Sequence, residues 1–146
     1  MASLVILLLQ ETKIEEDYLL SLSNKYWKMN VGKDVSARGN ASGIATLWTE
    51  NAFSMEHSHT SQHWILSELR HTPSKKSLAL FNLYVPVNFQ EKRDCWNSLV
   101  AFLAANSFSN IIMASDLNII MNAKEKKGGV CGRGPMLYTV QNLILY

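Results

Sequence analysis

The sequence has little of what a disulfide framework, a zinc site or a membrane span requires. Its two cysteines, Cys95 and Cys131, lie far apart and form no paired spacing, which indicates neither zinc ligands nor a set of bridges. No apolar run approaches the roughly eighteen residues that cross a bilayer. The apolar run at 4–9 lacks a basic segment before it and a small-residue cleavage site after it, so it does not read as an export signal. We therefore expect an intracellular protein without a membrane partner, with no targeting signal and with the nucleus left open as a location.

The sequence also lacks a large excess of positive or negative charge, because 14 basic and 12 acidic residues leave a net charge of only +2. A field this weak points to no nucleic acid and no anionic membrane by itself. The apolar fraction is 47% and the charged fraction 18%, which is typical of a globular chain and not of a disordered one. A length of 146 residues predicts a single domain spanning 1–146.

Hydrophobic periodicity in the first half of the chain predicts a strand, a helix and then several strands. Residues 4–9 read as a buried strand, and Thr12 with Glu15 has the spacing of a capping box for a helix that follows. The stretch 31–43 is rich in Gly, Ser and Asn and is interpreted as a loop. Short strand-like runs then follow at 44–48, 52–56, 62–70 and 78–85, which predicts an antiparallel meander.

The second half begins with the clearest helix, over 88–106. Asn88 and Glu91 can cap its start, and the apolar stripe is formed by Trp96, Leu99, Val100 and Leu103. A strand is expected at 110–114, a basic glycine loop at 124–135, and a last apolar segment of undecided type at 136–146. This order predicts a mixed α/β (α+β) domain with a mostly antiparallel sheet.

Polar residues interrupt or end three of these apolar strands. Glu11 follows the first strand, Asn82 and Tyr84 share one face of another, and Asp116 and Asn118 follow the strand at 110–114. Each has an ordinary structural explanation, since strand ends collect polar residues and carboxylates suit the first turn of a helix. The alternative is that rigid strand ends hold carboxylates and amides together for a metal-assisted phosphate site.

The ordered motifs resemble the endonuclease/exonuclease/phosphatase superfamily, with its DNase I-like four-layer α/β sandwich. They are most similar to the endonuclease domains of plant non-LTR retrotransposon polyproteins, which accompany a reverse transcriptase. The motifs are "LLLQETKIE", "SGIATLW", "NLYVPVNFQEKRDCWNSL" and "SDLNIIMNAKEKKGG". Any one of them is weak, but the ordered set covers nearly the whole chain.

The resemblance implies a role for each of these polar residues. Glu11 would be a ligand of a divalent metal, normally Mg²⁺ with Mn²⁺ as a substitute, and Tyr84 would contact the scissile phosphate. Asp116 would orient or deprotonate the attacking water, whereas Asn118 would hydrogen-bond the phosphate or brace the other groups. Asn82 would support them from behind. The reaction implied is phosphodiester hydrolysis, with DNA as partner.

The sequence also departs from the pattern of this superfamily. An earlier strand with a metal-binding Asn, a later Asp-x-Asn element and a closing Ser-Asp-His motif have no counterpart, and Ser115 and Leu117 replace the usual Gly and Phe. We therefore interpret the chain as a partial domain with weak or no nuclease activity. A phosphatase of the same fold and a non-catalytic remnant that serves as an interaction module remain alternatives. An uncovered sheet face would favour self-association.

The histidines and the basic loop give weaker signals. His57, His59 and His63 have a spacing that could suggest a metal site, but histidines in strands and turns are usually structural. The loop contains Lys124, Lys126, Lys127 and Arg133. These cations could contact a nucleic-acid backbone, although a solvated loop is the alternative.

Overall fold

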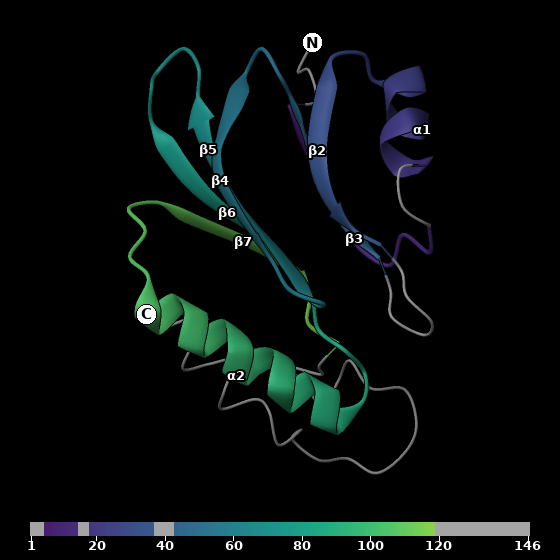
Figure 1. Ribbon diagram of the computed structural model, residues 1–146, viewed down its shortest axis with the longest axis vertical. Coiled ribbons are helices and arrows are strands. Elements are labelled where there is room, and N and C mark those ends of the chain that lie inside the picture. Colours follow the sequence, from purple (N-terminus) through teal and green to yellow (C-terminus); the bar gives the residue numbers. More distant parts are fainter. Residues whose placement is uncertain (1–4, 15–17, 37–42, 119–146) are drawn as a thin grey trace, which may run out of the picture. The chain divides into compact units, whose positions relative to one another are not determined.

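The computed structural model describes residues 5–14, 18–36 and 43–118. They belong to two compact units. The first unit is drawn from Met1–Tyr84 and Phe108–Asp116, and it holds all seven described strands and one helix (Figure 1). The second is drawn from Val85–Ser107 and Leu117–Tyr146 and holds the other described helix. In the described part of the chain, no helix is long and apolar enough to pass through a bilayer.

The first unit contains a three-stranded antiparallel sheet in the order β1-β3-β2. Its strands are β1 (Ile6–Leu9), β2 (Asn30–Val35) and β3 (Ile44–Thr49). The central strand β3 is almost completely buried because both of its faces are covered. One face carries Ala45 and Leu47, which pack against Leu19 of the helix α1 (Tyr18–Tyr26).

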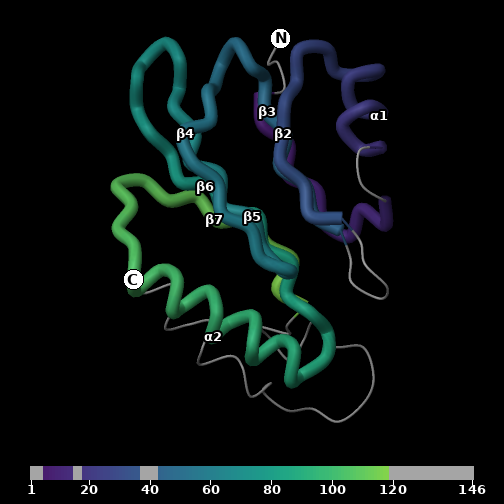
Figure 2. Tube along the Cα trace, viewed as in Figure 1, coloured from purple at the N-terminus to yellow at the C-terminus, as the bar shows by residue number. Residues whose placement is uncertain are grey.

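The second sheet of this unit has the order β4-β5-β6-β7. Its strands are β4 (Phe53–Thr60), β5 (Trp64–His71), β6 (Ser77–Tyr84) and β7 (Ile111–Asp116). The pairings β4–β5 and β5–β6 are antiparallel, as the meander prediction expects, whereas β6 and β7 are parallel. Figure 2 shows β6 and β7 running side by side although some thirty positions separate them in sequence.

The two sheets pack face to face through apolar side chains. Trp48 of β3 meets Leu69 and Leu80 of the second sheet, and Ile44 of β3 meets Ile65 and Tyr84. Alternation then assigns the faces of β5, because residues 65, 67 and 69 point toward the first sheet and residues 64, 66, 68 and 70 point away from it. The mixed α/β fold with two mainly antiparallel sheets confirms the predicted fold class.

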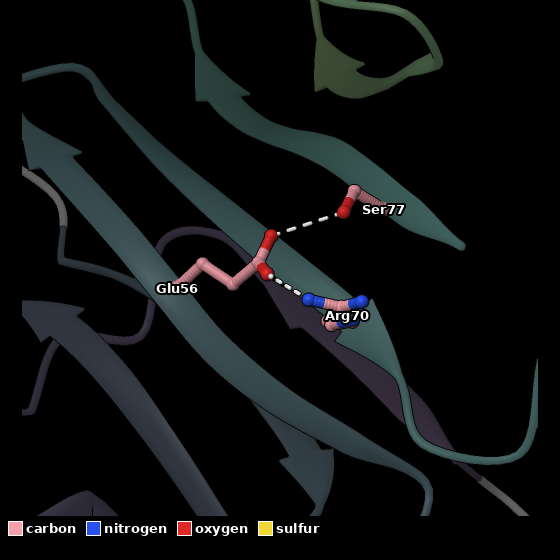
Figure 3. Close-up of polar contacts among 3 residues, drawn as sticks. All are labelled: Glu56, Arg70 and Ser77. Atoms are coloured by element: carbon pink, nitrogen blue, oxygen red, sulfur yellow. Dashed lines mark hydrogen bonds and ion pairs between the residues drawn. The ribbon is translucent and has the colours of Figure 1, made fainter. Parts of the chain in front are cut away.

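A polar cluster lies on the other face of the second sheet, where β4 contains a bulge between Met55 and His57. Glu56 at the bulge accepts hydrogen bonds from Arg70 at 3.3 Å and from Ser77 Oγ at 3.0 Å (Figure 3). The Arg70 side chain is 48% exposed. An exposed ion pair of this kind adds at most about 1 kcal/mol, so the cluster mainly ties three neighbouring strands together.

The second unit contains α2 (Phe89–Ala105), whose start agrees with the sequence. Asn88 caps the helix, since its side chain accepts hydrogen bonds from the backbone N–H groups of Gln90 and Glu91. Trp96 and Leu99 are buried as predicted. The apolar stripe predicts that Val100 is buried too, but Val100 is 43% exposed, because position 100 lies about 100° around the helix from position 99.

Two local predictions are wrong. The first part of the predicted loop at 31–43 is a strand, because residues 30–35 form β2, in which Gly32 lies closely against Leu47 and Thr46 of β3. Residues 37–42 of that prediction lie outside the described residues. Thr12 does not cap a helix either, because residues 12–14 are not helical and the Thr12 N–H donates to the Gly43 carbonyl at 2.9 Å. In both cases a contact with a distant strand overrides the local signal.

Candidate functional site

The candidate site lies in the first unit, where β1, β6 and β7 end. Tyr84 is the last residue of β6 and Asp116 the last residue of β7, and the two residues are paired in the parallel register. Residues paired in this way point to the same face, with their strands about 4.8 Å apart. Glu11 follows β1 by two positions. Its Oε1 atom accepts a hydrogen bond of 2.5 Å from the Tyr84 hydroxyl.

These three side chains differ in burial: Tyr84 is buried, whereas the two acids are accessible to solvent. Tyr84 is only 9% exposed and packs against Ile44 and Ile65, so its ring is held in place. Glu11 and Asp116 are both exposed. Two accessible carboxylates beside a fixed phenol therefore form one polar patch at the edge of the apolar interface between the sheets.

A buried polar network lies immediately below this patch. Asn82 is completely buried, and its Nδ2 atom donates to the carbonyls of Leu9 at 3.1 Å and Ala45 at 2.7 Å. Gln10 donates through Nε2 to Asn82 Oδ1 at 3.0 Å and to the Ala114 carbonyl at 3.4 Å. Asn82 and Gln10 thus connect β1, β3, β6 and β7 directly behind Glu11 and Tyr84.

The backbone that presents Glu11 has an unusual conformation. Glu11 and Lys13 both have φ of 52°, which is the left-handed region that residues with a side chain rarely adopt. The hydrogen bond from the Thr12 N–H to the Gly43 carbonyl lies between them. Left-handed residues cost on the order of 1–3 kcal/mol each and cluster at functional sites. The conformation of this turn is therefore consistent with a functional role of the Glu11 carboxylate.

Asn118 belongs to the second unit, so its side chain is described with that unit. It also has a positive φ of 47°. Its Nδ2 atom donates to the Val85 carbonyl at 2.7 Å, and its own carbonyl accepts from Lys92 Nζ at 2.6 Å. Lys92 is 92% removed from solvent, with 8% exposure. Two hydrogen bonds therefore fasten Asn118 within this unit, one to Val85 before α2 and one to Lys92 in the first turn of α2.

Sequence reasoning did not assign functions to Gln10 or Lys92, and it considered His63 only as a possible metal ligand with His57 and His59. All three lie at or near predicted residues of their own units. Gln10 directly precedes Glu11 in the motif on which the resemblance rests, and that position was the available signal. The basic residues Lys124, Lys126, Lys127 and Arg133 lie outside the described residues. Among the described residues, no three His, Cys, Asp or Glu side chains form a cluster suited to a metal, and His57 and His59 lie on exposed positions of β4.

Comparison with known proteins supports the fold. No family model and no curated protein matches the sequence. Solved structures do match, among them the human Nocturnin catalytic domain with bound sulfate (17% identity, TM-score 0.58). Others are the AP endonuclease LMAP from Leishmania major (18%, 0.54) and the 2′,3′-cyclic phosphatase ANGEL2 in complex with adenosine-2′,3′-vanadate (15%, 0.60).

These matches cover most of this chain but only about half of each solved structure. They cover 79%, 86% and 94% of this chain but only 51%, 49% and 43% of the respective structures. The chain thus spans about half the length of these structures. At such low identity the likeness shows the DNase I-like fold alone and nothing about substrate.

Proposed function

We propose that this chain, with its DNase I-like fold, carries the cation-binding and phosphate-binding part of a divalent-metal-dependent phosphodiester hydrolase. The observation that carries the proposal is the 2.5 Å hydrogen bond between Tyr84 and Glu11 beside Asp116, the neighbour of Tyr84 in the strand register. Residues from three distant parts of the sequence meet there. The neighbouring structures include an endonuclease and a phosphatase, which is consistent with phosphate-ester chemistry in general.

The donor groups fit a hard divalent cation such as Mg²⁺ or Mn²⁺. Such cations take carboxylate oxygens, usually from one or two residues, and leave the other positions to water and phosphate. Glu11 uses Oε1 for the hydrogen bond from Tyr84, and Oε2 is the oxygen that we assign to the cation. A cation bound there would neutralise negative charge that develops on the phosphate oxygens.

The chain's own side chains would divide the remaining work. The Tyr84 hydroxyl donates a hydrogen bond to Glu11 in the structure and would turn this donor toward a phosphate oxygen when substrate binds. Asp116 would orient or deprotonate the attacking water, because its accessible carboxylate lies on the same face. The role of Asn118, either bracing the other groups or contacting the phosphate, stays a prediction from the resemblance; its amide donates to the Val85 carbonyl within its own unit.

The finer assignment is a retrotransposon-type endonuclease that acts on DNA. It is supported by the order of the "QET", "NLYVP" and "SDLN" motifs, which resemble plant retrotransposon endonucleases more than phosphatases. Because a Ser-Asp-His motif has no counterpart in the sequence, we expect this chain alone to cleave slowly or not at all. Loss of one positioned acid or base typically costs about a hundredfold to ten-thousandfold in rate.

The test combines metal binding with cleavage of supercoiled DNA. We expect Mn²⁺ binding, followed by electron paramagnetic resonance, in the wild type and in Asp94→Ala, a control acid that is exposed on α2. Binding should weaken strongly in Glu11→Gln. Any Mg²⁺-dependent nicking should disappear in Asp116→Ala and persist in Asp94→Ala. Absence of Mn²⁺ binding, or nicking that survives Asp116→Ala, would contradict the proposed site.

Two other outcomes identify the alternative functions. A folded chain that binds Mn²⁺ but leaves DNA and small phosphoesters intact would favour the non-catalytic remnant. Hydrolysis of small phosphoesters or cyclic phosphates without nicking would favour a phosphatase, an alternative that gains support from the likeness to ANGEL2.

A further inference from the structure

His63 directly precedes β5 and stands beside Tyr84. The Tyr84 N–H donates to the His63 carbonyl at 2.9 Å. The β5–β6 register pairs Trp64 with Leu83, and extending it by one position sets His63 opposite Tyr84. His63, just before β5, and Asp116, at the end of β7, therefore flank Tyr84 on its two sides.

The face on which His63 lies follows from the same register. Ile65 is paired with Asn82 and faces the first sheet, where it packs with Ile44 and Tyr84. His63 lies one position before β5, and its backbone hydrogen bond with Tyr84 continues the β5–β6 pairing. Extending the alternation of β5 by this one position assigns His63 to the face of Ile65. His63, just before β5, thus extends the row that Tyr84 and Asp116 form at the ends of β6 and β7, one step beyond the row of Ile65, Asn82 and Ala114.

The turn before β5 holds the backbone of His63 in place. Its N–H donates to Ser61 Oγ at 3.2 Å, and the Ser61 N–H donates to the Trp64 carbonyl at 2.9 Å. The His63 residue is only partly buried. A fixed backbone and a partly accessible imidazole are the properties that a ligand-contacting histidine needs.

The two histidines of β4 differ from His63 in position and in face. His59 is paired with Leu66 and His57 with Glu68, and residues 66 and 68 point away from the first sheet. Both histidines are exposed and lie two strands from β6. They therefore provide internal controls of the same residue type in the same sheet.

We propose that His63 is a phosphate-contacting residue of the site formed by Glu11, Tyr84 and Asp116, an inference that rests on the proposed function. Its imidazole N–H donates a hydrogen bond to a non-bridging oxygen of a phosphodiester whose phosphorus lies over Tyr84. The neighbouring strand is about 4.8 Å away, and this spacing suits a phosphate bridged between two adjacent side chains. The ordinary alternative is a turn histidine that does not contact phosphate.

The experiment uses the full chain labelled with ¹³C in its histidine and tyrosine rings. Diethyl phosphate with Mg²⁺ is the probe, since it is a phosphodiester too small for one bound molecule to contact both the site and a distant surface. We expect the His63 Hε1 signal, assigned from His63→Ala, to move saturably together with the ring signal of Tyr84. The signals of His57, His59 and His71 should stay in place.

Each other result contradicts a defined part of the argument. If Tyr84 moves and His63 does not, the role of His63 is wrong while the proposed function stands. If neither moves, both proposals fail. If His63 moves without Tyr84, or if His57 and His59 move equally, anions bind histidines away from the site and the inference is also wrong.

Affinity measurements separate ligand contact from a structural role. A hydrogen bond to a charged group is worth roughly ten- to a hundredfold in affinity, so we expect His63→Ala to weaken binding of the probe by at least about tenfold. His63→Gln retains an N–H donor and should restore part of this loss, whereas His59→Ala should bind like the wild type. Equal affinity of His63→Ala and His59→Ala, with unchanged melting temperatures, would overturn the proposal.

Discussion

At the scale of single residues, tertiary contacts hold a few residues in conformations that their local sequence does not favour. Glu11 and Lys13 are left-handed without being glycine, and the hydrogen bond from Thr12 to Gly43 holds the turn between them. Tyr84 has its ring in the apolar interface and its hydroxyl on Glu11. Such local cost persists only where surrounding contacts enforce it, and here the hydrogen bonds of Thr12 with Gly43 and of Tyr84 with Glu11 supply these contacts.

Cys95 is a residue whose ionisation can be predicted from burial. It is 3% exposed, and desolvation raises the pKa of its thiol from the usual 9.0 to about 11. The folded state binds the proton more tightly than the unfolded state does. The stabilisation from the neutral thiol is therefore complete below about pH 9 and is lost as the pH rises through about 11.

The corresponding prediction concerns thiol reactivity in a Cys131→Ser background, where Cys95 is the remaining thiol. At pH 8 we expect Cys95 of the native chain to react with Ellman's reagent at least about a hundredfold more slowly than in denaturant. A pKa of about 11 in place of 9.0 lowers the fraction of reactive thiolate by about that factor, and burial further restricts access of the reagent. Native and denatured chains that reacted at similar rates would show that Cys95 is accessible.

At the scale of elements, Asn82 connects the two sheets of the first unit. Its amide bonds the carbonyls of Leu9 in β1 and Ala45 in β3 from a fully buried position in β6. The apolar contacts on either side have no preferred register by themselves, whereas these hydrogen bonds are directional. The network therefore sets how β1, and with it Glu11, lies against β6.

We predict that Asn82→Ala destabilises the chain by about 3 kcal/mol, because it leaves buried carbonyls and Gln10 without their partner and opens a small cavity. Urea unfolding measures the change. Asn110→Ala is the matched control, since Asn110 is exposed and its amide also donates to a carbonyl, that of Ser77; its cost should remain below about 1 kcal/mol. Similar losses in the two variants would mean that the buried network is not what joins the sheets.

At the scale of the whole molecule, the second sheet ends in edge strands that carry apolar side chains. Within the described ranges β4 and β7 are its edges. Ile111 and Ile112 of β7 are 47% and 52% exposed. Exposed apolar edges are templates for pairing with another chain, which supports the self-association that we expect from the sequence.

Sedimentation velocity over a range of concentrations checks this prediction. We expect the wild-type chain to associate as its concentration rises, and Ile112→Lys to remain monomeric because a charged side chain at an edge opposes strand pairing. Val100→Lys, at a similarly exposed position of α2, should associate like the wild type. A wild-type monomer at every concentration would contradict association through β7.

The sequence by itself determined the features that depend on short-range patterns. These include the mixed α/β class, the strand–strand–strand order of β4 to β6, and the helix α2 with Asn88 as its cap. Apolar periodicity and capping act within a few residues, so they are legible before any contact is known. The polar residues at strand ends could also be identified from such short-range patterns. Their catalytic roles and the single-domain interpretation remain predictions.

Only the tertiary structure decided which of these residues meet. Strand register joins Tyr84 to Asp116, the packing of the two sheets brings Glu11 to Tyr84, and the β5–β6 pairing sets His63 beside them. The same long-range contacts made β2 a strand despite its loop-like composition, since Gly32 permits close approach to β3. Pairing between distant strands is cooperative and non-local, and for that reason a window of neighbouring residues does not contain it.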